Sequence, residues 1–174
     1  SVDDDQKTTI AKVFNANVNA INDTFHSLNM DDFEKAVSMI LNAREIVFVG
    51  SGGSSVVASD AHHKFIRTGL KVSTYSDYHL QLMALSQLSE DDLVIVISHT
   101  GSNLNMLSLL NVALDNNVKT IGITSYKKSP INDKVDVALN AVSQETKYQF
   151  EAFASRISHL SIIDALYISV RLQR

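Results

Sequence analysis

The hydrophobic positions of the first 44 residues follow a helical period. Apolar residues recur here at alternating spacings of four and three, which places them on one face of a helix. These residues are Phe14, Val18, Ile21, Phe25 and Leu28. Asn29 is a suitable N-cap for a second helix over 30–43, which has acidic residues in its first turn. The long apolar stripe packs either on this domain or on a partner chain, and the sequence leaves both options open.

From residue 45 onward, short apolar runs alternate with helical segments. The apolar runs predict strands over 45–50, 71–76, 92–98, 118–125 and 136–142. The segments between them predict helices over 54–69, 77–88 and 103–117. A closing helix is expected to bury Phe150, Phe153, Ile157, Leu160, Ile163, Tyr167 and Val170.

Strands that alternate with helices predict an α/β fold with helices on both faces of a parallel sheet. We expect a three-layer αβα sandwich with five strands in the flavodoxin-like order 2-1-3-4-5 and with extra N-terminal helices. The chain has a single proline, Pro130, and no glycine-rich linker. We therefore expect one domain over residues 1–174, with N-terminal helices over 1–44 and an α/β core over 45–174.

Composition narrows the class of protein. The 174 residues are 45% hydrophobic and 20% charged, which is ordinary for a globular domain. The absence of cysteine excludes a disulfide framework, thiol catalysis and a thiolate zinc site. The net charge of −4 argues against a basic face for duplex DNA, and the acidic first residues are unlike a secretory signal. We expect a cytoplasmic protein.

Two polar loops follow neighbouring strands of the expected sheet. "GSGGSS" over 50–55 ends the first strand, and "SHTGSN" over 98–103 ends the third. In the order 2-1-3-4-5 these strands are adjacent at the switch point, where ligands bind beyond the carboxyl ends of the strands. Both loops lead into a helix N-terminus, and neither contains lysine or arginine. Each loop alone is more typical of a turn, but the pair predicts a neutral cradle for one phosphate monoester.

At these residues the chain resembles the SIS (sugar isomerase) domain, a phosphosugar-binding fold. The segments "SGGSSVVASDAHHKFIRTGLKV", "SDYHLQLMALSQLSEDDLVIVISHTGS", "VKTIGITSYKKSPINDKVDVAL", "SQETKY" and "SRISHLSIIDALY" are together similar to the ligand-sensing half of RpiR-type transcriptional regulators. The resemblance spans about residues 45–174.

The resemblance implies a set of phosphosugar contacts. Ser54 and Ser98 match family serines, Thr100 keeps the hydroxyl of another, and Asn103 stands where threonine is usual. Glu145 matches a glutamate that lies near the sugar. The expected binding residues are Gly52, Gly53, Ser54, Ser55, Ser98, His99, Thr100, Gly101, Asn103 and Glu145, with His79 as a further sugar contact.

These resemblances imply a phosphosugar sensor for transcription regulation, with no catalytic residue and no cofactor. The first 44 residues are too short and too acidic for the helix-turn-helix domain of an RpiR-type regulator. We therefore expect DNA binding only through a domain absent from this chain. The resemblance also implies a homodimer or a dimer of dimers, with the sites near the interface.

Two other functions stay open at this point. A stand-alone sugar-phosphate isomerase or lyase would use Glu145 as its general base, with His79 or His99 assisting. A dinucleotide-binding domain is a third reading, because "GSGGSS" nearly makes G-x-G-x-x-G, although Ser55 occupies the third glycine position.

The histidines predict no metal site. The adjacent residues His62 and His63 would point about 100° apart on a helix. His26 and His159 are expected on the surface or in packing contacts. Among sugars, hexose 6-phosphates, amino-sugar 6-phosphates and pentose 5-phosphates all stay open.

Overall fold

The computed structural model describes residues 5–142 and 151–174, and it contains the expected parallel sheet. The strands are β1 (Ile46–Gly50), β2 (Val72–Thr74), β3 (Leu93–Ser98), β4 (Lys119–Thr124) and β5 (Val137–Asn140). All neighbours pair in parallel, in the order β2-β1-β3-β4-β5. This confirms the predicted fold class and strand order.

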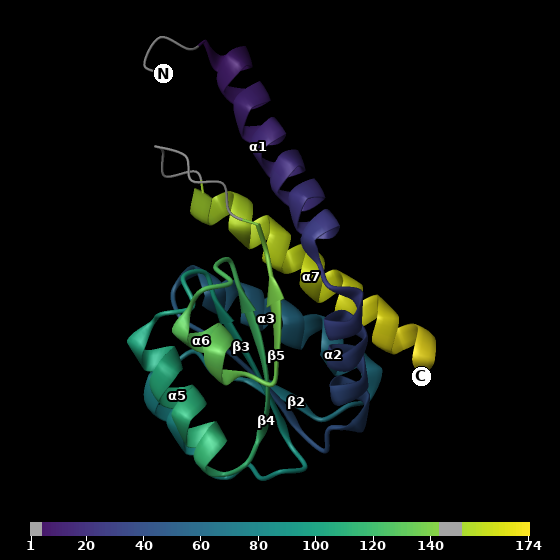
Figure 1. The fold of residues 1–174 in the computed structure, drawn as a ribbon, viewed down its shortest axis with the longest axis vertical. Coiled ribbons are helices and arrows are strands. Elements are labelled where there is room, and N and C mark those ends of the chain that lie inside the picture. The colour runs from purple at the N-terminus through teal and green to yellow at the C-terminus, as the bar shows by residue number, and fades with distance from the viewer. Residues whose placement is uncertain (1–4, 143–150) are drawn as a thin grey trace.

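Helices cover both faces of the sheet (Figure 1). They are α1 (Gln6–Ser27), α2 (Met30–Asn42), α3 (Gly53–Phe65), α4 (Tyr78–Ser86), α5 (Leu104–Asp115), α6 (Pro130–Lys134) and α7 (Glu151–Gln173), with a 3₁₀ turn at Ile66–Thr68. One core cluster joins α2, α3 and α7 to one face of the sheet, and a second joins α4, α5 and α6 to the other. The result is the predicted three-layer arrangement.

The strands at the centre of the sheet are buried on both faces. Phe48 and Ile95 point toward α3 and α7, whereas Val49 and Val96 point toward the α4 and α5 side. Successive side chains of a strand alternate between faces, so a strand covered on both sides reads as a continuous apolar run. This explains why the apolar runs located β1 and β3 in the sequence.

Local signals mark several helix ends, among them the predicted N-cap at Asn29. The Asn29 side chain accepts a hydrogen bond from the backbone N–H of Asp32 and caps α2. Gly69 and Asn117 have φ angles of +80° and +58°, the left-handed conformation that ends a helix. The short helix α6 was not predicted, because only Ser129 as N-cap and Pro130 in the first turn mark it.

The predicted buried face of α7 is partly wrong. Phe153 is 57% exposed, and Ile157 and Leu160 are only partly buried. The helix instead buries Ser155, Ser158, His159, Ile162, Ile163, Leu166 and Val170. The helix packs on α1, α2 and α3 together, and its buried positions include the small or polar residues Ser155, Ser158 and His159. The predicted Phe150 lies outside the described residues.

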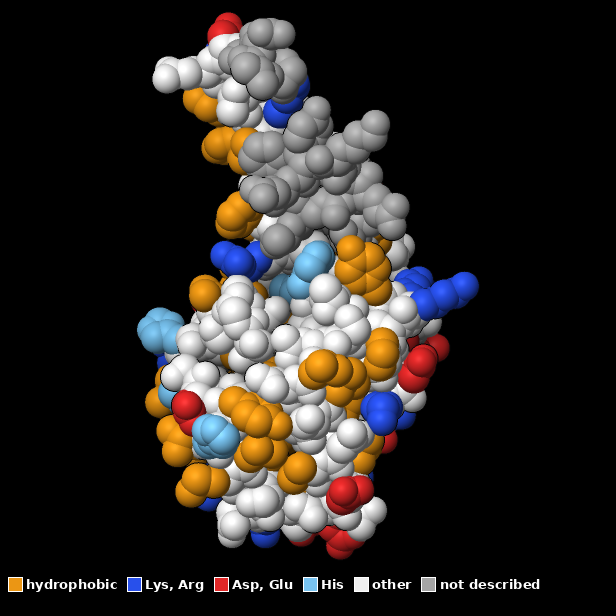
Figure 2. Space-filling view, turned by 90° about the vertical axis from the view of Figure 1, so that its left-hand side faces the viewer, with side chains coloured by type: hydrophobic (Ala, Val, Ile, Leu, Met, Phe, Trp, Pro, Cys, Tyr) orange, Lys and Arg blue, Asp and Glu red, His pale blue; other side chains and the backbone are white. Residues whose placement is uncertain are grey.

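The first helix extends beyond the body of the domain (Figure 1). It packs on α7 and buries Ala20 and Thr24, whereas Phe14 and Phe25 of the predicted stripe are 67% and 69% exposed. Figure 2 shows hydrophobic side chains on the surface of this upper part of the molecule. Within the described residues the stripe is therefore divided: Phe14, Val18 and Phe25 are exposed, whereas Ile21 and Leu28 are partly buried. No helix in the described part of the chain is long and apolar enough to cross a bilayer.

Candidate functional site

The two polar loops lie side by side at the carboxyl ends of β1 and β3. Gly50 at the end of β1 pairs with Ile97 near the end of β3, so the segments that follow them start together. The first loop leads into α3, with Gly52 as its N-cap at a φ of +57°. The second leads into α5, with Asn103 as its N-cap. Two helix N-termini, the positive ends of two helix dipoles, thus meet at one place.

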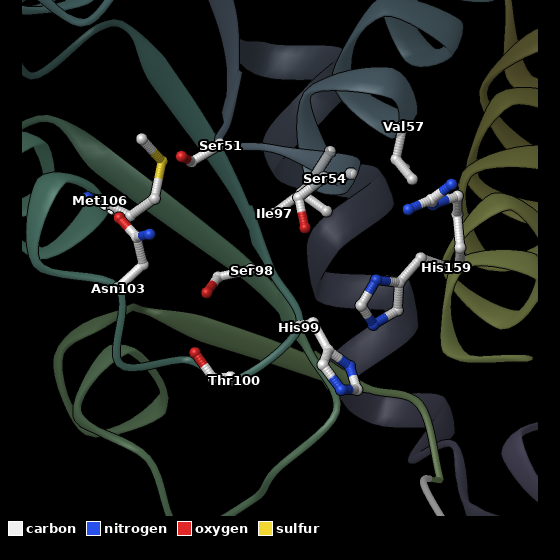
Figure 3. Close-up of a pocket in the computed structure, with 12 residues that line it drawn as sticks. Ser51, Ser54, Val57, Ile97, Ser98, His99, Thr100, Asn103, Met106 and His159 are labelled. Carbon is white, nitrogen blue, oxygen red and sulfur yellow. Dashed lines mark hydrogen bonds between the residues drawn. The ribbon is translucent and has the colours of Figure 1, made fainter. Parts of the chain in front are cut away.

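A pocket of about 210 Å³ opens between these loops and α7 (Figure 3). Its lining consists of Ser51, Gly53, Ser54, Val57, Ile97, Ser98, His99, Thr100, Asn103, Met106, Arg156 and His159. Six of the predicted binding residues are in this set: Gly53, Ser54, Ser98, His99, Thr100 and Asn103. The pocket is polar on the loop side and apolar where Val57, Ile97 and Met106 line it.

The hydroxyl groups of the second loop keep hydrogens to donate. Ser98 Oγ accepts the backbone N–H of Gly101 at 3.1 Å, and Thr100 Oγ1 accepts that of Ser102 at 3.2 Å. Each hydroxyl serves as an acceptor in its loop bond, so its own hydrogen remains available to a ligand. The Asn103 side-chain oxygen accepts the backbone N–H of Met106, which leaves its amide group as a donor. The loop therefore presents donors, which an anion requires.

Other predicted residues are not among the residues that line the pocket, and two of them, Ser55 and Gly101, support the loops instead. Ser55 Oγ donates to the carbonyl of Gly52 at 2.6 Å and closes the first turn of α3. Gly101 has a φ of +68°, and an added Cβ there would overlap the side chain of Ser129. His79 is exposed on α4, beside the ring of Tyr78, and is not part of the lining. Glu145 lies outside the described residues.

Arg156 lines the pocket from α7 and corrects the prediction of a neutral cradle. Its guanidinium lies against Gly53, at the start of α3, and 5.5 Å from the centre of the Phe153 ring. None of the ion pairs among the described residues involves Arg156. A cation beside the positive end of a helix dipole is unfavourable unless an anion lies between them. Arg156 was missed because it is far from both loops in sequence.

His159, also on α7, contributes a second basic side chain to the pocket. It is 2% exposed, and its Nε2 lies 3.0 Å from Ser125 Oγ. The same hydroxyl lies 3.0 Å from Nδ1 of His99. Burial and the nearby charge of His99 lower the pKa of His159 to about 4, so His159 is neutral at pH 7. The sequence interpretation of His159 as a packing residue accounts for its burial but missed its place in the pocket.

A larger hollow of about 430 Å³ lies along β5. Its lining includes Asp32, Asp133 and Asp136 together with Lys127. Three carboxylates there would repel a phosphate, so the pocket between the loops is the better anion site.

Comparison with known proteins gives a consistent family assignment. The family model described as "SIS domain" matches residues 39–169. An uncharacterized HTH-type transcriptional regulator of Thermotoga maritima is 37% identical over 96% of this chain and 60% of its own length. The HTH-type transcriptional regulator RpiR of Escherichia coli K12 is 31% identical over 97% of this chain and 57% of its own length. The chain thus spans about 60% of the length of these relatives.

Among solved structures, the Vibrio vulnificus NanR protein complexed with ManNAc-6P superposes with a TM-score of 0.89. It is 25% identical to this chain, and the match covers 95% of this chain and 62% of NanR. Both the family model and these relatives agree with the resemblance seen in the sequence.

Proposed function

Because this chain belongs to the SIS domain family, we propose that the pocket between β1 and β3 binds a phosphosugar as an effector. The domain would be the sensing part of an RpiR-type transcriptional regulator, as the named relatives are. Its partner would be a small sugar phosphate, and its effect on DNA would pass through a region outside this chain.

One observation carries this proposal: two helix N-termini, two loop hydroxyls and one arginine converge on one small pocket. The hydroxyls belong to Ser98 and Thr100, and the arginine is Arg156. Together they offer the short, charge-assisted hydrogen bonds that a phosphate dianion accepts. The remaining volume and the apolar wall at Val57 and Met106 suit the ring of a small ligand rather than a long one.

The named relatives support sensing over turnover, because they are transcriptional regulators. An aldose–ketose isomerase needs a general base beside the sugar carbons. Isomerase or lyase activity with Glu145 as the base is the second candidate, and it is supported only by the resemblance of this chain to the SIS domain family. Turnover of the bound phosphosugar, measured by product analysis after prolonged incubation, would distinguish an enzyme from a sensor.

Dinucleotide binding has weaker support. Asp77, which follows β2, is the acidic residue that would be needed for a ribose. Its carboxylate instead accepts the backbone N–H of Leu80 at 3.0 Å and caps α4. This reading also leaves the second loop without a role.

We also propose that the protein pairs with a second copy of itself through α1. This helix extends from the body, and its exposed apolar residues are Phe14, Val18 and Phe25 of the stripe together with Ile10. Exposed apolar side chains gathered on one helix face are typical of an interface. A second copy is the occupant that the SIS resemblance favours.

The proposal is tested by thermal unfolding of the chain with a panel of phosphosugars and their dephosphorylated parents. The panel contains ManNAc-6P, hexose 6-phosphates and pentose 5-phosphates. A ligand at about 100 times its dissociation constant stabilises the folded state by about 2.7 kcal/mol. We expect one phosphosugar to raise the melting temperature while its parent sugar does not.

Two serine variants make this test specific. Ser98→Ala should abolish the shift, whereas Ser59→Ala, an exposed position on α3 away from the pocket, should retain it. A shift with nicotinamide dinucleotide and with no phosphosugar would support dinucleotide binding instead. Absence of any shift would remove the support for the phosphate site.

A further inference from the structure

The segment between β4 and α6 supports the second polar loop from the side opposite the pocket. In the sheet order, the loop after β3 has the loop after β1 on one side and the segment after β4 on the other. The backbone N–H of Ser125 donates to the carbonyl of His99 at 3.0 Å, and that of Ile131 donates to the carbonyl of Gly101 at 2.9 Å. The buried Ser129 side chain lies so close to Gly101 that a Cβ there would overlap it. The supporting segment thus holds the loop at two of its carbonyl groups.

These two hydrogen bonds set the direction of two amide groups in the loop. In a trans peptide, a carbonyl and the N–H of the next residue point in opposite directions. Because the carbonyls of His99 and Gly101 point toward the β4 side, the N–H groups of Thr100 and Ser102 point toward the side of β1 and the pocket. The Ser102 N–H there donates to Oγ1 of Thr100, which lines the pocket. At these two peptides the loop therefore turns its donors toward an entering anion.

The side chain of Asn132, on α6, ties the supporting segment to the sheet. Its Nδ2 donates to the carbonyl of Lys127 in that segment at 3.2 Å and to Oδ1 of Asn140 on β5 at 2.7 Å. Its Oδ1 lies 2.8 Å from the hydroxyl of Thr124, which is buried at the end of β4. A carboxamide offers two N–H donors and an acceptor, so it can serve all three contacts at once. One partly buried side chain thus joins β4, β5 and the supporting segment.

We propose that Asn132 is a positioning residue of the anion site, which keeps the amides of Thr100 and Ser102 aimed at the pocket. This proposal rests on the proposed phosphosugar site. Asn132 is not among the residues that line that pocket and lines the hollow along β5 instead, so it acts on the ligand only through the supporting segment. Donors that are oriented in advance need no ordering when the ligand enters. Loosening the supporting segment therefore lowers the affinity for the anion.

The test is an NMR titration with inorganic phosphate, the group that every candidate phosphosugar shares. The backbone amide signals of Ser54, Thr100 and Ser102 are followed in the unaltered chain and in two variants. Asn132→Ala removes the side chain without adding a charge. Asn132→Asp keeps the shape of the side chain, loses both amide hydrogens and adds a charge. Each titration is made well below the melting temperature of the variant, so that a loss of stability alone does not change the dissociation constant.

Both variants should raise the dissociation constant of phosphate by about tenfold, the change expected for the loss of one hydrogen bond to a charged group. Both should also move the amide signals of Thr100 and Ser102 before phosphate is added. Asn111→Ala is the matched control, because Asn111 is an exposed asparagine on α5 whose Oδ1 accepts a hydrogen bond from Lys134 of α6. This control should bind phosphate like the unaltered chain.

Three other outcomes would overturn the proposal. If both Asn132 variants melt at a lower temperature but bind phosphate with an unchanged dissociation constant, Asn132 supports only the fold, and the phosphate site stands. Weaker binding in Asn132→Asp together with normal binding in Asn132→Ala would show charge repulsion and no positioning. If phosphate moves none of the three amide signals in the unaltered chain, the positioning role and the proposed function both fail.

Discussion

The guanidinium of Arg156 lies so close to Gly53 that an added Cβ would overlap its terminal nitrogen. Gly53 is the first residue of α3, whereas Arg156 comes from the last helix of the chain. The missing side chain at Gly53 therefore allows a cation to reach the N-terminus of α3. This contact joins the polar loops to α7 and gives the pocket its charge.

We predict that Gly53→Ala weakens phosphosugar binding with little loss of stability. The new methyl group displaces the tip of a flexible arginine, and alanine favours a helix over glycine by roughly 0.5–1 kcal/mol. Gly52→Ala should instead lower the stability and leave phosphosugar binding largely unchanged. Gly52 has no neighbour within 4 Å, but its φ is +57°. With a ψ of −127° this backbone lies outside the αL region, and such a sparsely populated conformation costs other residues roughly 1–3 kcal/mol. Calorimetric titration and thermal unfolding of both variants check this, and unchanged affinity in Gly53→Ala would contradict it.

Arg156→Gln should lower the affinity for the phosphosugar by about tenfold or more. A hydrogen bond to a charged group contributes roughly 1.5–3 kcal/mol, which corresponds to that range. Arg171→Gln, at an exposed position near the other end of the same helix, is the matched control. Isothermal titration at two salt concentrations measures the effect. Equal affinities for the two variants would show that Arg156 does not contact the ligand.

The buried His159 should make the stability of the free protein depend on pH. Its pKa is about 4 in the folded protein, against about 6.5 in the unfolded chain. Between these values the unfolded state binds more protons, so the free energy of unfolding falls as the pH drops from about 7 to 4. The loss from this residue amounts to roughly 3 kcal/mol.

Comparison with His159→Gln isolates this contribution from that of the carboxylates. Chemical denaturation at several pH values should give a shallower decline for the variant, because glutamine does not titrate. Parallel curves for the two proteins would mean that His159 is not held neutral by burial.

Charge on the exposed stripe of α1 should disrupt self-association. Phe14→Glu places a carboxylate at a 67% exposed apolar position on this helix. Sedimentation equilibrium should show a dimer for the unaltered chain and a monomer for the variant. Met83→Glu, at an exposed position on α4, should leave the dimer intact. A monomeric unaltered chain would show that α1 does not pair with a second copy.

Local features of the fold could be predicted from short stretches of sequence. The strands β1 and β3 could be recognised as continuous apolar runs because both faces of each strand are covered. Asn29 and Gly69 mark helix ends through their own side chain or backbone. The short helix α6 was missed because five residues contain too little periodic pattern. The face of α7 was misjudged because the prediction counted apolar residues alone, whereas Ser155 and Ser158 are among the buried positions.

The sequence by itself determined the sheet, its order and the two hydroxyl-rich loops, because these depend on local pattern and on the general rule for parallel sheets. Only the tertiary structure decided which residues of α7 meet those loops. Arg156 and His159 enter the pocket because α7 packs across α3, and periodicity does not encode that rotation. The linkage of His99 through Ser125 to His159 likewise exists only in three dimensions. The two hydroxyl-rich loops were thus readable from the chain, whereas the arginine and histidine side chains beside them came from contacts between distant segments.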